Sequence, residues 1–238
     1  MAFPDYEIIS LEGLRSFQEV YDLQLEILAK RIQDQIPDTF IVCEHLPVIT
    51  RGRGLQFQEK RKEKAKPLTE IPSSTDYIEI ERGGDLTWHG PGQLVVYPIV
   101  KLGGDSRIGK LIGQDIDRWI RFLENVWINI LTDFQVEAHS KAGGSGVWLQ
   151  TQFDGGLVGE QKVMSVGIAL RRWVSYHGIA VNIVNDLTPF FSFDPCGYQA
   201  EVMTRLKDLK GIPADCFTPN WRNLWEKRFF QSVNNLIA

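Results

Sequence analysis

The residues best suited to covalent chemistry lie on a short turn, Asp194-Pro195-Cys196-Gly197-Tyr198. Pro195 and Gly197 shape the backbone on either side of Cys196, whereas a structural cysteine is usually an inert apolar filler. The turn therefore favours a presented thiol that acts as a nucleophile, with a packed, unreactive thiol as the alternative. Cys43, inside an apolar run, and Cys216 are interpreted as structural.

A cysteine nucleophile reacts as its thiolate, so it needs a cation or a base nearby. The candidates are Lys162, His89 and His177. Lys162 opens the run Lys162-V-M-S-V-G-I-A-Leu170, which otherwise has the composition of a buried strand. A lysine at that position can be partly desolvated and suited to proton transfer. The alternative is a lysine whose ammonium reaches solvent from the strand end.

A second candidate is the Gly-rich segment Glu81-R-G-G-D-L-T-W-H-G-P-G-Gln93, which has apolar, strand-like runs on both sides. Gly83 and Gly84 carry no side chain, so the backbone there can approach a ligand closely and present its N–H groups. The turn His89-G-P-G-Gln93 could aim the imidazole back toward them. A decorated β-hairpin with a hydrogen-bonded core histidine is the alternative.

The elements that must position these groups follow from hydrophobic periodicity. Strands are predicted over residues 39–43, 76–81, 94–100, 135–138, 146–149, 162–171 and 173–182, and helices over 14–35, 201–209 and 221–232. One further long helix is predicted from Ile108 to Ile130, with Asp105 or Ser106 as its N-cap. The last four strands are predicted to form an antiparallel meander. Strands grouped together with a few helices indicate an α+β fold.

The amino-acid composition limits the classes of protein to which this chain can belong. The 238 residues suit one large domain or two small ones, and 43% hydrophobic and 24% charged residues are ordinary for a globular protein. The net charge of −4 lacks the basic excess of a nucleic-acid binder. The N-terminal segment has no signal-peptide pattern, and the apolar runs are too short to span a bilayer. Three widely spaced cysteines argue against a disulfide framework or a zinc site, so we expect a reduced, cytoplasmic protein.

Other motifs are absent or partial. The chain contains no G-x-x-x-x-G-K-[ST], H-E-x-x-H or G-x-S-x-G pattern. Thr50-R-G-R-Gly54 partly matches the Arg/Gly nucleotide loop of biotin ligases but lacks the further Gly, Arg and Trp of that loop. The charge-dense run Glu59-K-R-K-E-K-A-Lys66 mixes signs and is interpreted as a solvated loop or short helix. We see no internal repeat.

Four segments in chain order together resemble one family. They are Arg82-G-G-D-L-T-W-H-G-P-G-Q-Leu94, Lys162-V-M-S-V-G-Ile168, Trp173-V-S-Y-H-G-I-A-V-Asn182 and Pro195-Cys196-Gly197-Tyr198, with Thr204-Arg205-Leu206 downstream. The set resembles the octanoyltransferases of lipoate biosynthesis, also called lipoyl(octanoyl) transferases, within the biotin/lipoate protein ligase superfamily. The resemblance covers roughly residues 40–206.

The resemblance implies a fold and an activity. It implies a mixed, largely antiparallel sheet flanked by helices, in a single catalytic domain over residues 1–238. It implies transfer of an octanoyl group from octanoyl acyl carrier protein to a lysine of lipoyl domains, through an acyl-thioester intermediate. The acceptors would be lipoyl domains of 2-oxoacid dehydrogenase complexes and the glycine cleavage H protein. No cofactor, metal, nucleotide, nucleic acid or membrane has a role in this reading.

The resemblance also assigns residues. The acyl-accepting cysteine falls on Cys196 and its partner lysine on Lys162. The substrate-binding positions fall on Arg82, Gly83, Gly84, Asp85, Leu86, Thr87, Trp88, His89, Ser165, Val166, Gly167, Gly178, Ile179 and Ala180. Two features depart from the family pattern: a longer, Gly-rich segment over residues 150–161, and Asp85 and Trp88 at positions that vary.

Three alternatives remain at this point. An ATP-dependent lipoate or biotin ligase would need no cysteine, and the sequence reads H-G-P-G-Q where lipoate ligases tend to read H-D-x-G-N. A non-catalytic protein would only bind acyl carrier protein or lipoyl domains, and the presence of both Cys196 and Lys162 argues against it. A thioesterase would use the same cysteine with water as the acceptor.

Overall fold

A seven-stranded mixed sheet forms the centre of the computed structural model, which describes residues 4–53, 75–152, 158–193 and 200–238. Across the sheet the strands are β1 (Glu7–Arg15), β2 (Thr39–His45), β6 (Gln93–Ile99), β10 (Val174–Asn182), β9 (Val158–Arg171), β8 (Gly144–Gln152) and β7 (Ala138–Lys141). The β1–β2 pair is parallel and the other neighbouring pairs are antiparallel. The predictions of a mixed, largely antiparallel sheet and of a terminal meander are confirmed.

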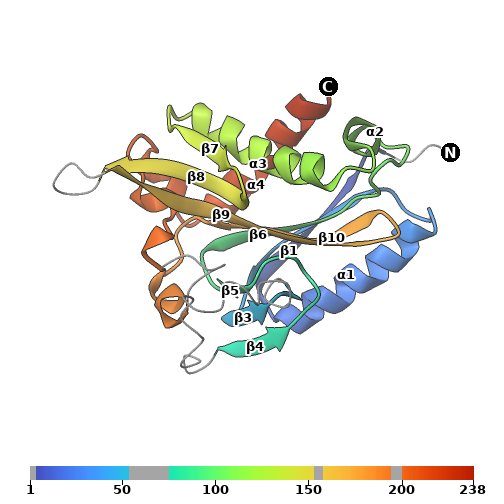
Figure 1. Cartoon of the computed structure of the whole chain (residues 1–238), viewed down its shortest axis with the longest axis horizontal. Helices are drawn as coiled ribbons and strands as arrows, with labels where there is room; N and C mark the ends of the chain where they lie inside the picture. Colours follow the sequence, from blue (N-terminus) through green and yellow to red (C-terminus); the bar gives the residue numbers. More distant parts are fainter. Residues whose placement is uncertain (1–3, 54–74, 153–157, 194–199) are drawn as a thin grey trace.

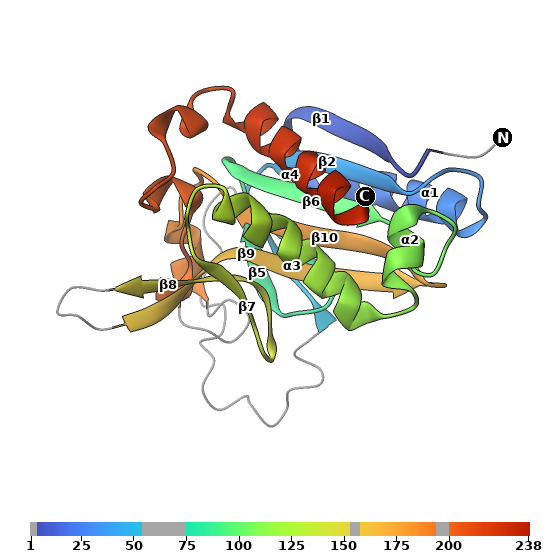
Figure 2. The same cartoon turned by 90° about the horizontal axis from the view of Figure 1, so that it is seen from above.

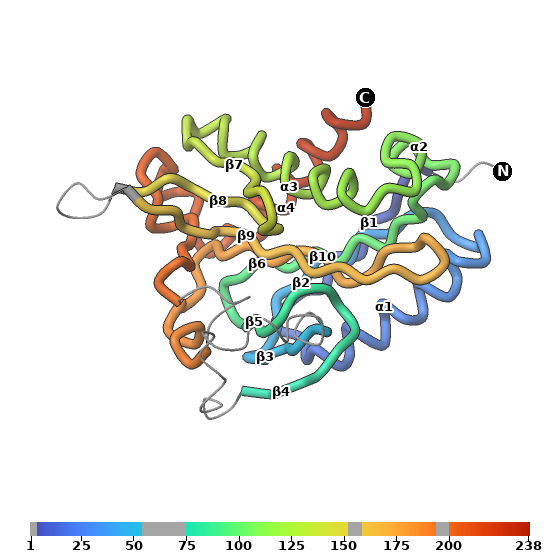
Figure 3. The backbone as a smooth tube through the Cα atoms, in the orientation of Figure 1, coloured from blue at the N-terminus to red at the C-terminus, as the bar shows by residue number. Residues whose placement is uncertain are grey.

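The two faces of this sheet carry different layers. A small sheet of β4 (Asp76–Glu79), β3 (Val48–Arg51) and β5 (Leu86–His89) lies on the same face as helix α1 (Phe17–Ile32) (Figures 1 and 3). Helices α3 (Ile116–Thr132) and α4 (Trp221–Ile237) lie side by side over the opposite face, with the short α2 (Arg107–Ile112) beyond them (Figure 2). The central strands are therefore covered on both sides.

Alternation along the central strands sends successive side chains into two separate cores. Phe40 and Val42 of β2 pack in the cluster beneath α3 and α4, whereas Ile41 and Cys43 pack in the cluster beneath α1. The neighbouring β6 divides its side chains in the same way. Because both faces are buried, these strands appear in the sequence as continuous apolar runs, which is why their positions were predictable.

The long helix predicted from Ile108 to Ile130 is wrong, because the chain forms two helices there. Ser106 caps α2, as predicted, and its Oγ accepts the Gly109 N–H at 2.9 Å. Gly113 then ends α2 in the left-handed region at φ +68°. Asp115 starts α3 by accepting the Arg118 N–H at 2.9 Å. The apolar spacing continues across the break, so periodicity alone did not reveal it.

The helix predicted over residues 201–209 is also wrong. The segment forms two short 3-10 turns, Ala200–Val202 and Leu206–Asp208. Between them Met203 makes a parallel bridge to Lys162, and the Thr204 N–H donates to the Lys162 carbonyl at 3.0 Å. The N–H groups of Met203, Asp208 and Leu209 therefore close 3-10 turns, whereas that of Thr204 pairs with β9 and interrupts the helix.

Strand predictions failed where side chains are exposed or strands are short. β1 was not predicted, and its Ile8 and Leu14 are more than 40% exposed. The short β3 and β5 were not predicted either. β7 begins three residues later than expected, after Gln135 adopts a left-handed φ of +59°. The charge-dense run 59–66 and the Gly155-Gly156 loop lie outside the described residues.

No helix among the described residues has the length and hydropathy that a membrane span requires.

Candidate active site

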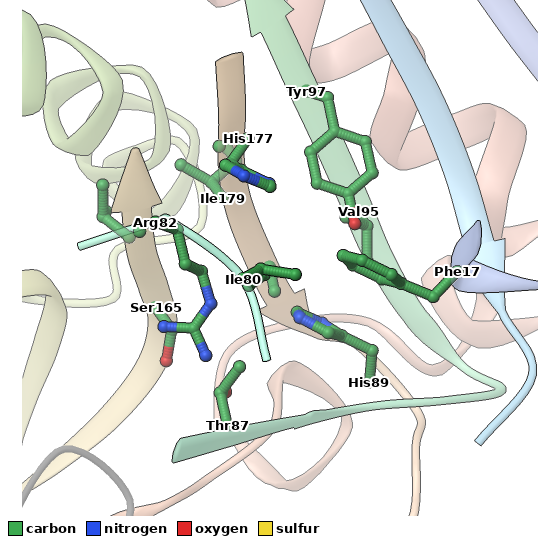
Figure 4. Close-up of a pocket in the computed structure, with 14 residues that line it drawn as sticks. Phe17, Ile80, Arg82, Thr87, His89, Val95, Tyr97, Ser165, His177 and Ile179 are labelled. Carbon is green, nitrogen blue, oxygen red and sulfur yellow. The ribbon is translucent and has the colours of Figure 1, made fainter. Parts of the chain in front are cut away.

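A cavity lies between the α1-side face of the large sheet and the small sheet (Figure 4). Its empty volume is about 410 Å³, a figure that includes space open to solvent. The lining comes from α1, β5, β6, β9, β10 and the segment between β4 and β5: Phe17, Ile80, Arg82, Thr87, His89, Val95, Tyr97, Ser165, Val166, Gly167, His177, Gly178, Ile179 and Ala180.

The structure brings together most of the residues that the sequence proposed for substrate binding. Those at the cavity are Arg82, Thr87, His89, Ser165, Val166, Gly167, Gly178, Ile179 and Ala180. The side chains of strand β5 alternate between two environments. Thr87 and His89 face the cavity, whereas Leu86 and Trp88 pack against Phe190. Gly83, Gly84 and Asp85 support the loop and do not line the cavity.

Arg82 is 6% exposed and its guanidinium holds the Gly-rich loop together. Its Nε and Nη2 donate to Thr50 Oγ1 at 3.2 and 2.9 Å, and Nη2 also donates to the Asp85 carbonyl at 2.7 Å. Nη1 donates to the Gly83 carbonyl at 2.9 Å. A planar group with several donors can tie a loop that has few side chains of its own. These hydrogen bonds make Arg82 an anchor of the Gly-rich loop.

Close backbone approach explains why this loop contains glycine. The Gly83 N–H donates to the Ile168 carbonyl of β9 at 2.8 Å, so it pins the loop and is not an open anion donor. Gly52 lies beneath the loop, where a Cβ would come within 2.4 Å of the Gly84 carbonyl oxygen. The Arg/Gly segment at Thr50–Arg53 therefore supports the candidate site from below.

A hydrogen-bond network connects three of the four motif segments found in the sequence, those at residues 82–94, 162–168 and 173–182. His89 Nδ1 donates to Gln93 Oε1 at 2.8 Å, and Gln93 Nε2 donates to Asn182 Oδ1 at 2.9 Å. Asn182 Nδ2 donates to the Thr204 carbonyl at 2.9 Å, while the Thr204 N–H donates to the Lys162 carbonyl. The network fixes the backbone of Lys162 relative to the loop that carries His89.

His89 is buried and poorly suited to accept a proton. Burial, with a contribution from nearby His45, lowers the pKa of His89 to about 3. Burial likewise lowers the pKa of His45 and of His177 to about 4 each. All three imidazoles are therefore neutral at pH 7. This argues against the role of proton acceptor, for which His89 was a candidate.

His177 combines an unusual backbone with an unsatisfied ring. Its φ is +54°, a region that residues with a Cβ seldom adopt. The ring stacks on Tyr21 and Tyr176 at centroid distances of 5.5 and 4.8 Å. Neither ring nitrogen has a hydrogen-bond partner among the described residues, although the side chain is 1% exposed and lines the cavity. Such a group marks a place that water or a ligand atom would satisfy.

Lys162 is buried at 4% exposure, so the solvent-reaching alternative is wrong. It is also the fifth residue of β9 and not the first. Its Nζ lies 5.3 Å from the centroid of the Trp148 ring, which attracts a cation. A Cβ on Gly146 would come within 2.5 Å of Lys162 Cε, so the glycine makes room for the lysine stem. The Gly146 N–H in turn donates to Glu124 Oε1 at 2.7 Å.

Cys196 lies outside the described residues. The residues on either side of that segment, Phe193 and Ala200, are buried in one cluster with Leu86 and Trp88 of β5. The other two cysteines are buried, and burial raises the pKa of both the Cys43 and the Cys216 thiol. A raised thiol pKa opposes formation of a thiolate, in agreement with the structural roles expected for them.

Five residues at the cavity were not among the proposed substrate-binding positions: Phe17, Ile80, Val95, Tyr97 and His177. Val95 and Tyr97 alternate with the core residues Leu94 and Val96, so period-2 alternation along β6 contained the signal. Phe17 carries no such local signal, because it reaches the cavity only through the docking of α1.

Comparison with known proteins assigns the family. Residues 16–220 match the family model of the lipoyl protein ligase A/B catalytic domain. The chain is 37% identical over 201 residues to an octanoyltransferase of Geobacter metallireducens, covering 84% of this chain and 82% of that protein. It is 36% identical to an octanoyltransferase of Aeromonas hydrophila, covering 84% of this chain and 78% of that one.

Solved structures agree on the fold. A lipoate-protein ligase A bound with ATP matches with a TM-score of 0.56 at 13% identity, covering 96% of this chain and 85% of that one. A bi-partite lipoate protein ligase of Thermoplasma acidophilum also matches with a TM-score of 0.56 at 13% identity, covering 96% and 83%. Identity this low supports the shared fold alone. The sequence relatives therefore decide between ligase and transferase: this chain belongs to the octanoyltransferases, acyltransferases of the lipoyl protein ligase A/B catalytic-domain family.

Proposed function

We propose that the protein transfers an octanoyl group from octanoyl acyl carrier protein to a lysine of lipoyl domains, through a thioester on Cys196. The acceptors would be lipoyl domains of 2-oxoacid dehydrogenase complexes and the glycine cleavage H protein. The observation that carries the proposal is Lys162, a buried lysine on β9, the strand whose Ser165, Val166 and Gly167 line the cavity. The chain that follows the Cys196 segment is hydrogen-bonded to β9 at this same lysine.

In the first half-reaction the Cys196 thiolate attacks the thioester carbonyl of the donor. The carrier's sulfur leaves as a thiolate and takes a proton from the Lys162 ammonium, so that a thiol departs. Exchange of one thioester for another changes little free energy, so positioning and stabilisation of the oxyanion set the barrier. A charged Lys162 also favours the thiolate before attack.

In the second half-reaction the acceptor lysine must lose a proton before its amine can attack. Neutral Lys162 takes that proton from the acceptor ammonium. The amine then attacks the Cys196 thioester, the amide bond forms and the Cys196 thiolate leaves. The second amine proton passes to solvent, so both catalytic groups return to their starting charges. The expected kinetic pattern is ping-pong.

The buried cavity supports an acyl substrate. Ile80, Val95 and Ala180 provide apolar surface for a chain, and each buried methylene contributes about 0.8 kcal/mol to binding. The cavity also adjoins β9, the strand that carries Lys162. An acyl chain held there would have its carbonyl end toward the proposed reaction centre.

The test is the intact mass of the protein after incubation with octanoyl carrier protein, without ATP or acceptor. We expect a gain of one octanoyl group, about 126 Da by composition, that is absent in Cys196→Ala. Cys43→Ala and Cys216→Ala are matched controls that should retain the adduct. Addition of a lipoyl domain should then discharge it.

Two outcomes would contradict the proposal. Octanoylation that requires free octanoate and ATP, with no adduct from the carrier protein, would indicate a ligase reaction. An adduct that decays to free octanoate equally fast with and without a lipoyl domain would indicate a thioesterase.

A further inference from the structure

The cavity has an open end and a closed end, and the exposure of its lining distinguishes them. Ser165 and Gly167 of β9 are partly exposed, whereas Val95, Phe17 and Tyr97 are 1–3% exposed. Figure 4 shows Ser165 on one side of the cavity and Phe17 and Tyr97 on the other. The cavity therefore opens at the strand that carries Lys162 and ends at the first turn of α1.

The cavity runs across the strands. Ser165 of β9 lies opposite Ala180 of β10, and Ala180 lies opposite Val95 of β6. Two steps between neighbouring strands of about 4.8 Å give a length of about 10 Å. A fully extended eight-carbon acyl chain is about 9 Å long, because each carbon–carbon bond of about 1.5 Å advances a zigzag by about 1.3 Å. This separation between the Ser165 and Val95 backbones is close to the length of one octanoyl chain.

The closed end is a tightly held aromatic wall. The Phe17 ring lies between 5.5 and 6.5 Å, centroid to centroid, from the rings of Tyr21, His45 and His89. Phe17 is also the first residue of α1, where Ser16 caps the helix by accepting the Glu19 N–H at 3.2 Å. A ring held by both its neighbours and its backbone cannot withdraw without repacking of the whole cluster.

Tyr97 and residues on the small-sheet side support Phe17 within this wall. The Tyr97 hydroxyl lies 2.7 Å from His45 Nε2, which fixes the tyrosine beside Phe17. Phe17 also packs with Val48 and Ile80, which belong to the small-sheet side of the cavity. A methylene added to an eight-carbon chain would meet these rings directly.

We infer that Phe17 is the specificity-determining residue that limits the acyl chain to about eight carbons. This inference rests on the proposed function, and it defines the substrate class as unbranched acyl thioesters no longer than octanoyl. Discrimination by one methylene against a rigid apolar wall is about tenfold or more. Ten- and twelve-carbon donors should therefore react successively more slowly than the octanoyl donor.

The test is competition between carrier proteins bearing six-, eight-, ten- and twelve-carbon acyl groups, read as the mass of the adduct on full-length protein. Wild type should favour eight carbons. Phe17→Ala removes the ring and should raise the ratio of twelve- to eight-carbon adduct at least about tenfold, with a smaller rise at ten carbons in Phe17→Leu. The leucine variant keeps an apolar side chain of helical propensity, so it retains the fold if the alanine variant does not.

The matched controls are Phe229→Ala and Phe229→Leu, which remove an equally buried ring from the opposite face of the sheet. They should lower stability without altering the chain-length profile. Adducts on both Phe17 variants with the wild-type profile would overturn this inference alone. Absence of any adduct on wild-type protein would overturn the proposed function, and with it this inference.

Discussion

The two faces of the central sheet are packed in different ways. Beneath α3 and α4 the buried residues are large and apolar, and Trp119, Trp127, Trp225 and Phe229 are fully buried there. Beneath α1 and the small sheet the lining includes Gly167, Gly178 and Ala180, several buried polar groups and a cavity. The first face maximises apolar burial, while the second leaves space and polar groups that a stable core alone would not require.

From this difference we expect the α3–α4 face to contribute mainly to stability and the α1 face mainly to function. Apolar burial contributes about 25 cal/mol per Å², so the α3–α4 face supplies a large stabilising share. A buried polar group without a partner costs about 1–3 kcal/mol, and His177 is such a group within the described structure. Changes on the functional face should therefore affect activity more than stability, and changes on the other face should do the reverse.

Replacing Lys162 with methionine gives the sharpest test of the functional face. Loss of the proposed proton-transfer group should reduce the transfer rate by about 100- to 10,000-fold. The thermal midpoint should stay the same or rise, because a buried cation is replaced by an apolar side chain of similar length. Rates of lipoyl-domain octanoylation and thermal unfolding measure the two effects.

Lys141→Met is the matched control. The Lys141 ammonium lies 4.4 Å from the centroid of the same Trp148 ring, but it is more exposed and also pairs with Glu160. Its loss should change the rate by less than about tenfold, well below the roughly 100-fold minimum of a proton-transfer contribution. Equal losses in the two variants would show that a cation at Trp148 matters only for structure.

Replacing Trp127 with alanine tests the other face. The indole is fully buried between α3 and α4, where it stacks on Trp225 with a 6.0 Å centroid distance. The free energy of unfolding should fall by about 3–5 kcal/mol, from lost burial and the resulting void. Urea unfolding measures the loss. The transfer rate is measured at a temperature where the variant is folded. A rate below a tenth of the wild-type rate would contradict the assignment of stability to the α3–α4 face and of function to the α1 face.

Acid should destabilise the protein through the histidines near the cavity. The folded-state pKa values of about 4 for His45 and His177 and about 3 for His89 lie below the ordinary 6.5. As the pH falls below 6.5 the unfolded chain binds protons that the folded chain does not, so stability present above pH 6.5 is lost progressively toward pH 4. Each unit of pKa difference corresponds to about 1.4 kcal/mol.

Urea unfolding between pH 7.5 and 5 measures this loss above the range where most carboxylates titrate. His45→Gln should flatten the dependence because one titrating group is removed. A free energy of unfolding that is constant over this range would contradict the neutral, buried state of these rings.

Replacing His177 with phenylalanine should give the smallest effect on stability. The change removes two buried nitrogens that lack partners while keeping an aromatic ring between Tyr21 and Tyr176. The free energy of unfolding should rise by about 1 kcal/mol. Tyr176→Phe, which removes a hydroxyl that donates to Glu81 at 2.9 Å, should instead lower it. A loss of stability in His177→Phe would show that the imidazole is satisfied, for instance by buried water.

The buried strands and the membership of the site could be predicted from the sequence for the same reason. Both faces of β2 and β6 are buried, so residues 40–43 and 94–99 form continuous apolar runs. Arg82, Thr87 and His89 lie on one loop and strand, so a local motif was sufficient to bring them together. The edge strand β1 was missed because its exposed residues face no core that would impose a pattern.

The sequence by itself determined which groups are available for chemistry: a lysine in a largely apolar run, a cysteine between a proline and a glycine, and a Gly-rich segment with an arginine. Only the tertiary structure decided the shape of the cavity. Phe17 and Val95 are 78 positions apart, and they meet because α1 docks against the face to which β6 turns its odd-numbered residues. Local propensity encodes which side chains a segment can present, but the distance between two such segments depends on packing between elements. The length of the cavity, and with it the proposed limit on the acyl chain, is therefore a property of the folded molecule.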